Sequence, residues 1–256
     1  MRKLLILLAA LACLLAGCGV SEPEPTEPTL PPPEPNPYTA EDFDWEGDRL
    51  VCRTGEAWTG IDVSSHQGTI DWAAVAADGV DFAMVRVGYR GIVDGELDAD
   101  INARANIEGA LAAGLEVGVY YFSQAVTPRE AAREAAFLIS FIEGCDITMP
   151  LVFDWEHVEN PDARTAALYD KDLLTDCALT FLGIVEAAGY EPMIYFNRYQ
   201  SEELFDLSAL RDYGFWLAVY DAPMTFPYRV DMWQYTDSGT VAGISGKVDL
   251  DLYFPR

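Results

Sequence analysis

Positively charged residues are scarce in this sequence of 256 residues. Sixteen lysines and arginines stand against 42 aspartates and glutamates, and the formal net charge is −26. Phosphate backbones and anionic lipid surfaces are bound through clustered lysine and arginine, so neither nucleic acid nor a membrane held by surface charge fits this composition. Half of the residues are hydrophobic, which is enough for one substantial core or two small ones.

Histidine and cysteine are also few, at two and five residues. No CxxC pair and no cluster of cysteine with histidine occurs, so no structural metal site is expected. Cys52, Cys145 and Cys177 lie beyond the leader described next, and an odd count leaves at least one thiol unpaired. We expect a disulfide between Cys145 and Cys177 with Cys52 free; three small buried thiols are the alternative.

The first 18 residues, MRKLLILLAALACLLAGC, show the pattern of a secretory signal, with two basic residues, an apolar run and then small residues. The apolar run of 14 residues is short for a helix that spans a bilayer. Its end, LAGC, resembles the bacterial lipobox, in which cleavage leaves the cysteine as a lipid-modified N-terminus. We therefore predict a lipoprotein signal peptide over 1–17, lipidation at Cys18 and an extracytoplasmic, membrane-anchored protein. An ordinary signal with an incidental cysteine is the alternative.

The segment after the leader, GVSEPEPTEPTLPPPEPNP, is rich in proline and glutamate and has little apolar surface to bury. Residues 18–40 are therefore expected to form an extended, disordered tether that holds a domain away from a membrane; a tail without a spacing role is the alternative. Residues 41–57 are expected to be an N-terminal extension that packs on the folded domain, and residues 58–256 to be the domain itself.

Short apolar runs alternate with helical patterns from residue 58 onward. This alternation indicates a parallel sheet covered by helices. The centres of the last three runs are only about 15 and 18 residues apart, too close for crossover helices, which need roughly a dozen residues beyond the strands. The fold class is therefore α/β, an irregular TIM-like barrel of about five strand–helix units followed by strands on short links. Strands are expected at 60–64, 82–88, 116–122, 149–154, 192–196, 215–220, 229–235 and 247–253, and helices at 70–78, 99–113, 128–143, 165–188 and 199–211.

Acidic residues follow several of these strands, where a barrel of this type carries its chemistry. Asp154 and Glu156, in PLVFDWEH, are two positions apart and would face the same side of a strand. Two carboxylates in different environments divide acid and base roles near neutral pH, although solvated acids at a strand end are the commoner explanation. Aromatic residues beside the strand ends suit the apolar faces of sugar rings: Tyr120, Tyr121, Trp155, Tyr195, Trp216, Tyr220 and Trp233.

Seven blocks in this order resemble the family 25 glycoside hydrolases, the N-acetylmuramidase lysozymes: GIDVSSHQGTIDW, FAMVRVGYRG, VGVYYFSQA, LVFDWE, MIYFNRYQ, FWLAVYD and MWQYTDSGTVAGISGKVDLDLY. The resemblance covers roughly residues 58–254. It implies a (β/α)5β3 barrel that cleaves the β-1,4 bond between N-acetylmuramic acid and N-acetylglucosamine in peptidoglycan. No cofactor is implied, because two carboxylates suffice for this reaction.

The resemblance also implies roles for individual residues. Glu156 corresponds to the general acid, Asp154 to the acid that orients or stabilises the reacting centre, and Asp62 and Asp249 to further acids of the site. Asp251 stands where many members carry asparagine. The sugar-binding candidates are Gln67, Arg86, Tyr120, Tyr121, Tyr195, Trp216, Tyr220, Trp233 and Gln234.

Three of these assignments carry alternatives. Tyr120 is the safer contact than Tyr121, because some members carry histidine at the second position. Arg86 would hold one of the site carboxylates ionised, or would form a structural ion pair instead. His66 is expected at the rim of the site, and His157 is expected to point away from it.

These features together predict a lipid-anchored, monomeric peptidoglycan hydrolase whose partner is the glycan strand. Two other functions stay open. A non-catalytic peptidoglycan-binding barrel would be expected to lack Glu156 or Asp154, and a related hydrolase would act on another 2-acetamido sugar polymer such as chitin.

Overall fold

The computed structural model describes residues 30–220 and 222–255. The predicted signal peptide, the lipidation site Cys18 and most of the predicted tether lie outside these residues. Within the described part, no helix combines the length and the hydropathy that crossing a bilayer would require.

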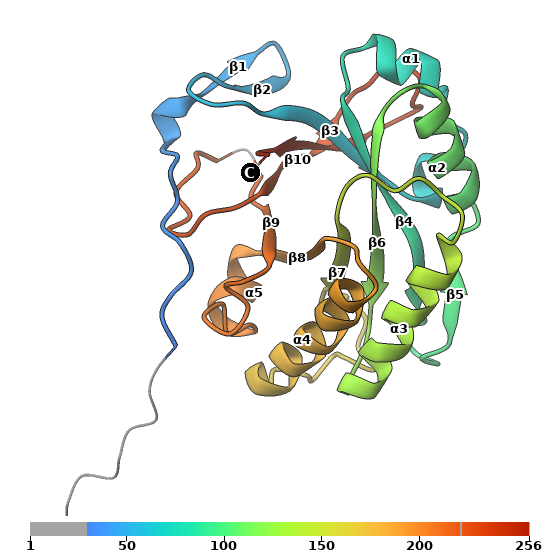
Figure 1. Cartoon of the computed structure of the whole chain (residues 1–256), viewed down its shortest axis with the longest axis vertical. Helices are drawn as coiled ribbons and strands as arrows, with labels where there is room; N and C mark the ends of the chain where they lie inside the picture. Colours follow the sequence, from blue (N-terminus) through green and yellow to red (C-terminus); the bar gives the residue numbers. More distant parts are fainter. Residues whose placement is uncertain (1–29, 221, 256) are drawn as a thin grey trace, which may run out of the picture. The chain divides into compact units, whose positions relative to one another are not determined.

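Eight strands close into a barrel (Figure 1), as the sequence predicted. Seven of them run parallel and β11 runs antiparallel to both of its neighbours, β10 and β3, while pairing of β3 with β4 closes the barrel. The strands in chain order are β3 (Trp58–Val63), β4 (Phe82–Arg90), β6 (Glu116–Ser123), β7 (Leu151–Trp155), β8 (Pro192–Asn197), β9 (Gly214–Ala218), β10 (Met232–Gly239) and β11 (Val248–Tyr253).

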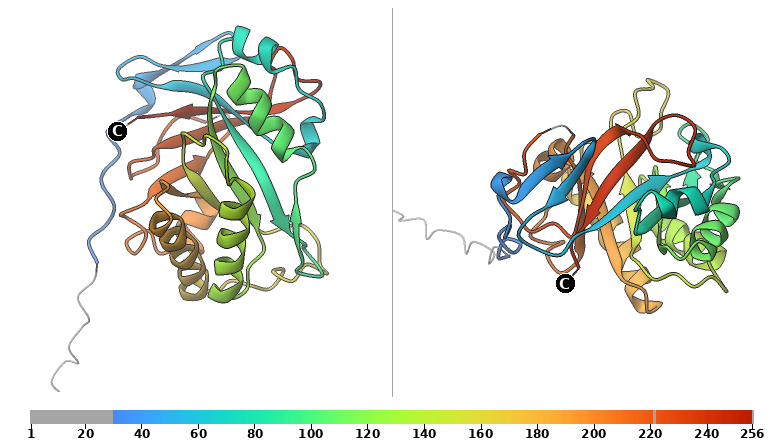
Figure 2. Two further views of the ribbon diagram at one scale, coloured as in Figure 1. Left: turned by 45° about the vertical axis from the view of Figure 1, so that its right-hand side comes forward. Right: turned by 90° about the horizontal axis from the view of Figure 1, so that it is seen from above.

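Helices follow the first five of these strands, and the larger ones pack on the outer face of β4, β6, β7 and β8 (Figure 2). They are α1 (Trp72–Ala77), α2 (Ala103–Ala112), α3 (Pro128–Phe141), α4 (Lys171–Ala187) and α5 (Arg198–Glu203); two short 3₁₀ turns are η1 (Ala40–Asp42) and η2 (Ser65–Gln67). The local signals are clear in α3, where Thr127 caps the first turn, Pro128 takes the first position and Gly144, with φ of 81°, follows the end.

All five predicted helices are longer than the observed ones, three of them by at least five residues. The predicted helix 99–113 begins only at Ala103, because Leu97–Ala99 forms a short strand, β5, antiparallel to the end of β4. The predicted helix 165–188 begins at Lys171, where Asp170 caps it. The predicted helix 199–211 ends at Glu203, and turns follow it.

Alternation along the strands divides the apolar residues into two clusters. Leu151, Phe153 and Trp155 of β7 face outward into the larger cluster between sheet and helices. Val152 of the same strand faces the barrel interior, where a smaller cluster fills the lumen. Asp154 shares the inward side with Val152, so a strand with one apolar face outward delivers a carboxyl into the barrel.

The last strands have no crossover helices, and the N-terminal segment covers their outer face instead. A hairpin of β1 (Phe43–Glu46) and β2 (Arg49–Cys52) places the Phe43 ring against Trp233, with ring centroids 5.1 Å apart. Upstream of it, the Asn36 amide N–H donates to the Pro227 carbonyl at 3.0 Å, and the Arg229 amide donates to Glu34 at 2.7 Å. Within the predicted tether over 18–40, residues 34–36 therefore pair with the 226–229 loop through their backbone groups.

The predicted disulfide between Cys145 and Cys177 is wrong in this structure, since Cys52, Cys145 and Cys177 are all free thiols. Cys177 is fully buried in the core under α4. The Cys145 sulfur, after α3, is only partly buried and accepts a hydrogen bond from the Arg104 guanidinium at 2.6 Å. The two cysteines thus face different surroundings.

Candidate active site

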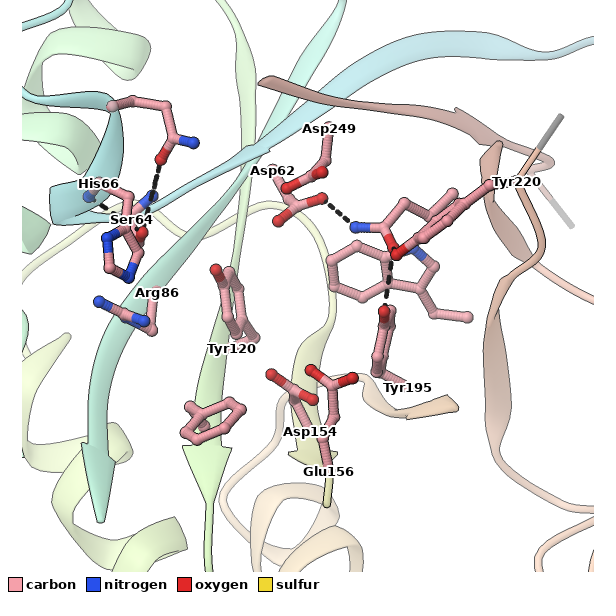
Figure 3. Close-up of a pocket in the computed structure, with 14 residues that line it drawn as sticks. Asp62, Ser64, His66, Arg86, Tyr120, Asp154, Glu156, Tyr195, Tyr220 and Asp249 are labelled. Carbon is pink, nitrogen blue, oxygen red and sulfur yellow. Dashed lines mark hydrogen bonds between the residues drawn. The ribbon is translucent and has the colours of Figure 1, made fainter. Parts of the chain in front are cut away.

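A cavity of about 240 Å³ opens at the carboxyl ends of the parallel strands (Figure 3). Because β11 runs antiparallel, its first residues reach the same end, and Asp249 pairs with Asp62 across the sheet. The lining residues are Asp62, Ser64, His66, Gln67, Arg86, Tyr120, Phe122, Asp154, Glu156, Tyr195, Trp216, Tyr220, Gln234 and Asp249.

Asp154 and Glu156 lie side by side at one wall of this cavity (Figure 3). Asp154 is 5% exposed, and its Oδ1 has no hydrogen-bond donor among the described residues. Between the two acids, the Trp155 ring turns outward and its indole N–H donates to the Ala125 carbonyl at 3.0 Å. The alternation expected from the sequence therefore brings both carboxyls into one pocket.

The backbone that carries this pair is held by two buried glutamines. The Gln124 side-chain amide donates to the Glu156 carbonyl at 2.7 Å, and the Gln200 amide donates to the Trp155 carbonyl. Gln124 is itself fixed, because the Thr165 hydroxyl donates to its Oε1 at 2.6 Å. These contacts restrain the peptide on which Glu156 sits.

Burial raises the pKa of both acids of the pair. It raises the pKa of Glu156 to about 7, with the negative charge of Asp249 as the second cause. Burial also raises the pKa of Asp154 well above its ordinary value, and the charge of Glu156 adds to this while the Arg86 guanidinium opposes it. A carboxyl with a pKa near 7 is suited to donate a proton near neutral pH.

Asp62 and Asp249 stand at the wall opposite the pair (Figure 3). The Gln234 amide donates to Asp62 Oδ2 at 2.6 Å, while Gln234 Oε1 accepts the hydroxyls of Tyr195 and Tyr220 at 2.9 and 2.7 Å. Burial is the main cause that raises the pKa of Asp62 well above its ordinary value, and the negative charges of its acidic neighbours raise this pKa further. Burial and the charge of Asp237 raise the pKa of Asp249 to about 6, against a hydrogen bond with Asp62 that lowers it.

Arg86 forms the structural ion pair that the sequence left as an alternative. Its NH2 lies 2.8 Å from Asp100 Oδ2 and 3.2 Å from the Ser65 hydroxyl oxygen. Asp100 also accepts the backbone amides of Ser65 and Asn102. Arg86 lines the cavity while its charge is largely compensated by Asp100, a carboxylate outside the Asp154–Glu156 pair.

All predicted site residues within the described part line the cavity except Tyr121 and Trp233. Tyr121 is fully buried on the outer face of β6, where its ring packs on Phe137 with centroids 5.7 Å apart. The Trp233 indole N–H donates to the Val219 carbonyl at 2.9 Å on the outer face of β10. The expectation that these two residues contact a sugar is wrong. Side chains alternate between the two faces of a strand, and the neighbours Tyr120 and Gln234 occupy the inner face.

The same alternation identifies lining residues that the sequence reasoning missed. Ser64 is two positions beyond Asp62, and Phe122 is two positions beyond Tyr120, so each shares the inner face with a predicted residue. His66 lines the cavity, as expected for a rim residue. His157 lies outside it, with its Nε2 hydrogen-bonded to the Leu168 carbonyl at 2.8 Å.

Among the described residues, no group of three or more His, Cys, Asp and Glu side chains has an arrangement that could hold a metal ion. What the cavity offers is a set of buried and half-buried acids with raised pKa values, ringed by tyrosine and tryptophan. This arrangement can transfer protons to and from a neutral polyhydroxylated ligand.

Comparison with known proteins gives consistent matches. Residues 61–244 match the sequence model described as Glycosyl hydrolases family 25. The chain is 26% identical over 197 residues to the autolytic lysozyme of Clostridium acetobutylicum. This match covers 75% of this chain and 54% of that protein. It is 28% identical over 201 residues to the uncharacterised protein YegX of Escherichia coli K12, covering 76% of this chain and 68% of that one.

Among solved structures, the modular autolysin LytC of Streptococcus pneumoniae, crystallised with a synthetic peptidoglycan ligand, is similar with a TM-score of 0.70 and 27% identity. The match covers 81% of this chain and 48% of LytC. The chain thus spans about half the length of LytC and of the clostridial lysozyme.

Proposed function

The chain belongs to family 25 of the glycosyl hydrolases, and from this premise we propose that it is a peptidoglycan hydrolase of the lysozyme type. It would cleave the β-1,4 bond between N-acetylmuramic acid and N-acetylglucosamine. The observation that carries the proposal is the Asp154–Glu156 pair, a buried and a half-buried carboxyl side by side in a pocket, with the pKa of Glu156 raised to about 7.

Glu156 is proposed as the general acid. At neutral pH a substantial fraction of its carboxyl carries a proton, which it delivers to the glycosidic oxygen as the bond to the departing sugar breaks. After the sugar leaves, the carboxylate accepts a proton from the incoming water. Gln124 and Gln200 hold the peptide so that this carboxyl stays aimed at the bond.

Asp154 is proposed to assist the substrate's own 2-acetamido group. Both acids leave one strand at the same wall, whereas a double displacement needs two carboxyls that flank the bond, about 5–5.5 Å apart. The acetamido carbonyl can attack the anomeric carbon intramolecularly, with the large effective concentration that such positioning gives. Asp154, whose Oδ1 has no donor among the residues that the structure describes, would accept the amide N–H and stabilise the cyclic cation. The rival is inversion, in which Asp62 or Asp249 activates water from the opposite wall.

Two further features of the proposal concern the sugar and the location. Tyr220 is 40% exposed at the rim and Phe122 lines the cavity, so their rings are available to apolar sugar faces. The leader sequence supports an extracytoplasmic protein anchored through a lipid at Cys18, acting as a monomer on glycan strands.

The decisive experiment is a digest of purified peptidoglycan followed by reduction and analysis of the new reducing ends. Muramic acid at the new ends supports the proposal, glucosamine points to another cleavage specificity, and no new ends favours a binding barrel. Glu156→Gln keeps the shape but removes the proton, so activity should fall by 10²-fold or more while binding to peptidoglycan persists. Glu159→Gln, in the same loop but outside the cavity, is the matched control and should leave the rate unchanged. If Glu156→Gln retains activity within a few fold, Glu156 is not the acid.

A further inference from the structure

The side chain of Gln234 joins residues from both walls of the cavity. Gln234 lies on β10 and is buried. Its amide N–H donates to Oδ2 of Asp62, on β3, at 2.6 Å. Its Oε1 accepts the hydroxyls of Tyr195 and Tyr220 at 2.9 and 2.7 Å. Four segments that lie far apart in the sequence therefore meet at one amide group.

Tyr195 brings this amide to the wall of the proposed acid. On β8 it is the register partner of Asp154, the β7 residue that precedes Glu156 by two positions. Asp62 stands at the opposite wall (Figure 3), and β9, β10 and β11 lie between β8 and β3 in the sheet. The hydrogen bonds from Tyr195 through Gln234 to Asp62 therefore cross the cavity from one acidic wall to the other.

The polar atoms of this amide are engaged within the protein. Each tyrosine hydroxyl has one hydrogen and gives it to Gln234 Oε1, so both lone pairs of that oxygen are occupied. The amide nitrogen faces a carboxyl oxygen of Asp62, to which it can donate. A flipped amide would set two oxygens against each other at this place. The sequence indicated sugar binding by Gln234, but its oxygen has no lone pair left for a sugar hydroxyl.

We propose that Gln234 is a positioning residue, which holds Asp62 and Tyr195 at a fixed separation across the cavity and holds the Tyr220 ring at the rim. The sugar on which Glu156 acts would lie between these walls, so their separation decides how the glycosidic oxygen meets the acid. The activity measurements rest on the proposed function; the hydrogen-bonded network does not.

Gln234→Leu tests the role in turnover, because it keeps a similar volume and removes all three hydrogen bonds. Under conditions where the variant is folded, kcat on peptidoglycan should fall by about 10-fold or more with little change in KM. A direct sugar contact would instead raise KM and leave kcat unchanged, and that result would overturn the positioning role.

Thr236→Val is the matched control. Thr236 is a buried polar residue on the same strand, outside the cavity lining, and its hydroxyl lies 3.2 Å from that of Ser238. The variant should keep the kcat and KM of wild type. An equal fall of kcat in Thr236→Val and Gln234→Leu would show a general effect of altering β10 and overturn the specific role of Gln234.

Gln234→Glu tests the donor to Asp62 separately. The introduced carboxyl still accepts both tyrosine hydroxyls, and when protonated it donates to Asp62 as the amide does. When ionised, it sets an oxygen against Asp62. Its kcat relative to wild type should therefore rise by about 3-fold or more from about pH 8 to about pH 5, while that of Gln234→Leu stays flat. A flat ratio for Gln234→Glu would overturn the donation to Asp62.

The groups around the introduced carboxyl favour its protonated form, because they are negative or neutral: Asp62 of β3, Asp249 and Asp251 of β11, Asp154 of β7, Tyr195 of β8 and Tyr220 after β9. The cation that lines the cavity, Arg86, is paired with Asp100. The rise in activity with acid should therefore begin above the pH at which an exposed glutamate takes up its proton.

A double-mutant cycle in stability tests the network without any activity. In wild type, Tyr195→Phe removes a hydroxyl bonded to Gln234 and should lower the ratio of folded to unfolded molecules by about 2–10-fold. In the Gln234→Leu background this hydroxyl has already lost its acceptor, so the same change should not lower the ratio. Urea titrations of the four proteins measure this difference. Effects that simply add would overturn the network.

A second set of variants applies if Gln234→Leu does not fold. Tyr195→Phe and Tyr220→Phe each leave the amide oxygen one donor, whereas the double variant leaves it none. The fall in kcat of the double variant should exceed the product of the two single falls by about 5-fold, and a simple product would overturn the shared role. If wild type makes no new reducing ends, the proposed function fails, while the urea titrations still decide the network.

Discussion

Gln124 provides a sharp test of how the fold positions the proposed acid. It is fully buried, and its side-chain NH2 donates to the carbonyls of Glu156 and Ser123 at 2.7 and 2.9 Å. Gln124→Leu keeps the volume but leaves these two carbonyls without that donor and the Thr165 hydroxyl without its acceptor. A buried polar group left unsatisfied costs about 1–3 kcal/mol, and leucine recovers part of this through apolar burial, so we expect a net destabilisation of about 2–4 kcal/mol.

The effect on turnover should exceed what lost stability explains. The Glu156 peptide would be free to shift, and a displacement of about 1 Å in a reacting group costs on the order of 10²-fold. At a temperature where Gln124→Leu is fully folded, kcat on peptidoglycan should fall by about 10–100-fold with little change in KM. Thr165→Val removes only the hydroxyl at the far end of the chain of contacts, so it should cost about 1 kcal/mol and affect kcat far less.

Urea denaturation and steady-state kinetics on the two variants decide the matter. The reasoning is refuted if Gln124→Leu loses the expected stability but keeps wild-type kcat, because the carbonyl contact would then serve folding alone. Gln200→Leu, which removes the donor to Trp155, should behave as Gln124→Leu does.

Three further predictions concern protons, stereochemistry and attachment. The rate should fall on the alkaline side of about pH 7, where Glu156 loses its proton, and Asp249→Asn should move this limb to lower pH by removing a negative charge; a limb that stays fixed contradicts the assigned cause. NMR of the first product should show retained configuration, and N-deacetylated glycan should be cleaved poorly; an inverted anomer or undiminished cleavage rules out acetamido assistance. Cys18→Ala should release the protein from membrane fractions with unchanged specific activity, and continued co-sedimentation with membranes would refute the lipid anchor.

The barrel was predictable because its information is local. Each strand is a short apolar run, so the number of strands can be read along the chain. The spacing between the last runs is too small for helices, so the absence of crossover helices there can be read as well. Strand β5 was missed because Leu97–Ala99 carries a single apolar side chain of any size and gains its place only by pairing with the extended end of β4. The N-terminal segment was assigned to the tether because its prolines predict no internal structure, whereas its partners lie about 190 residues away.

The lining of the cavity was predictable where we applied the alternation of side chains between the two faces of a strand, and not where we ignored it. Asp154 and Glu156 follow from a spacing of two, and the same rule excludes Tyr121 once Tyr120 is placed inside. The ion pair of Arg86 with Asp100 was not predictable, because it depends on the turn after β5 that brings Asp100 next to Arg86. The pairing of Asp249 with Asp62 depends on the antiparallel register of β11 with β3, which no local pattern encodes.

The docking of residues 34–36 onto the 226–229 loop sets a length scale for the proposed anchor. With lipid at Cys18, the chain available between bilayer and barrel runs only to Glu34, where the Arg229 amide holds it. Sixteen residue steps span at most about 55 Å even when fully extended. A protein anchored in this way would therefore reach glycan only in the layer of the wall nearest the membrane. The outer layers of a thick wall would lie beyond its reach.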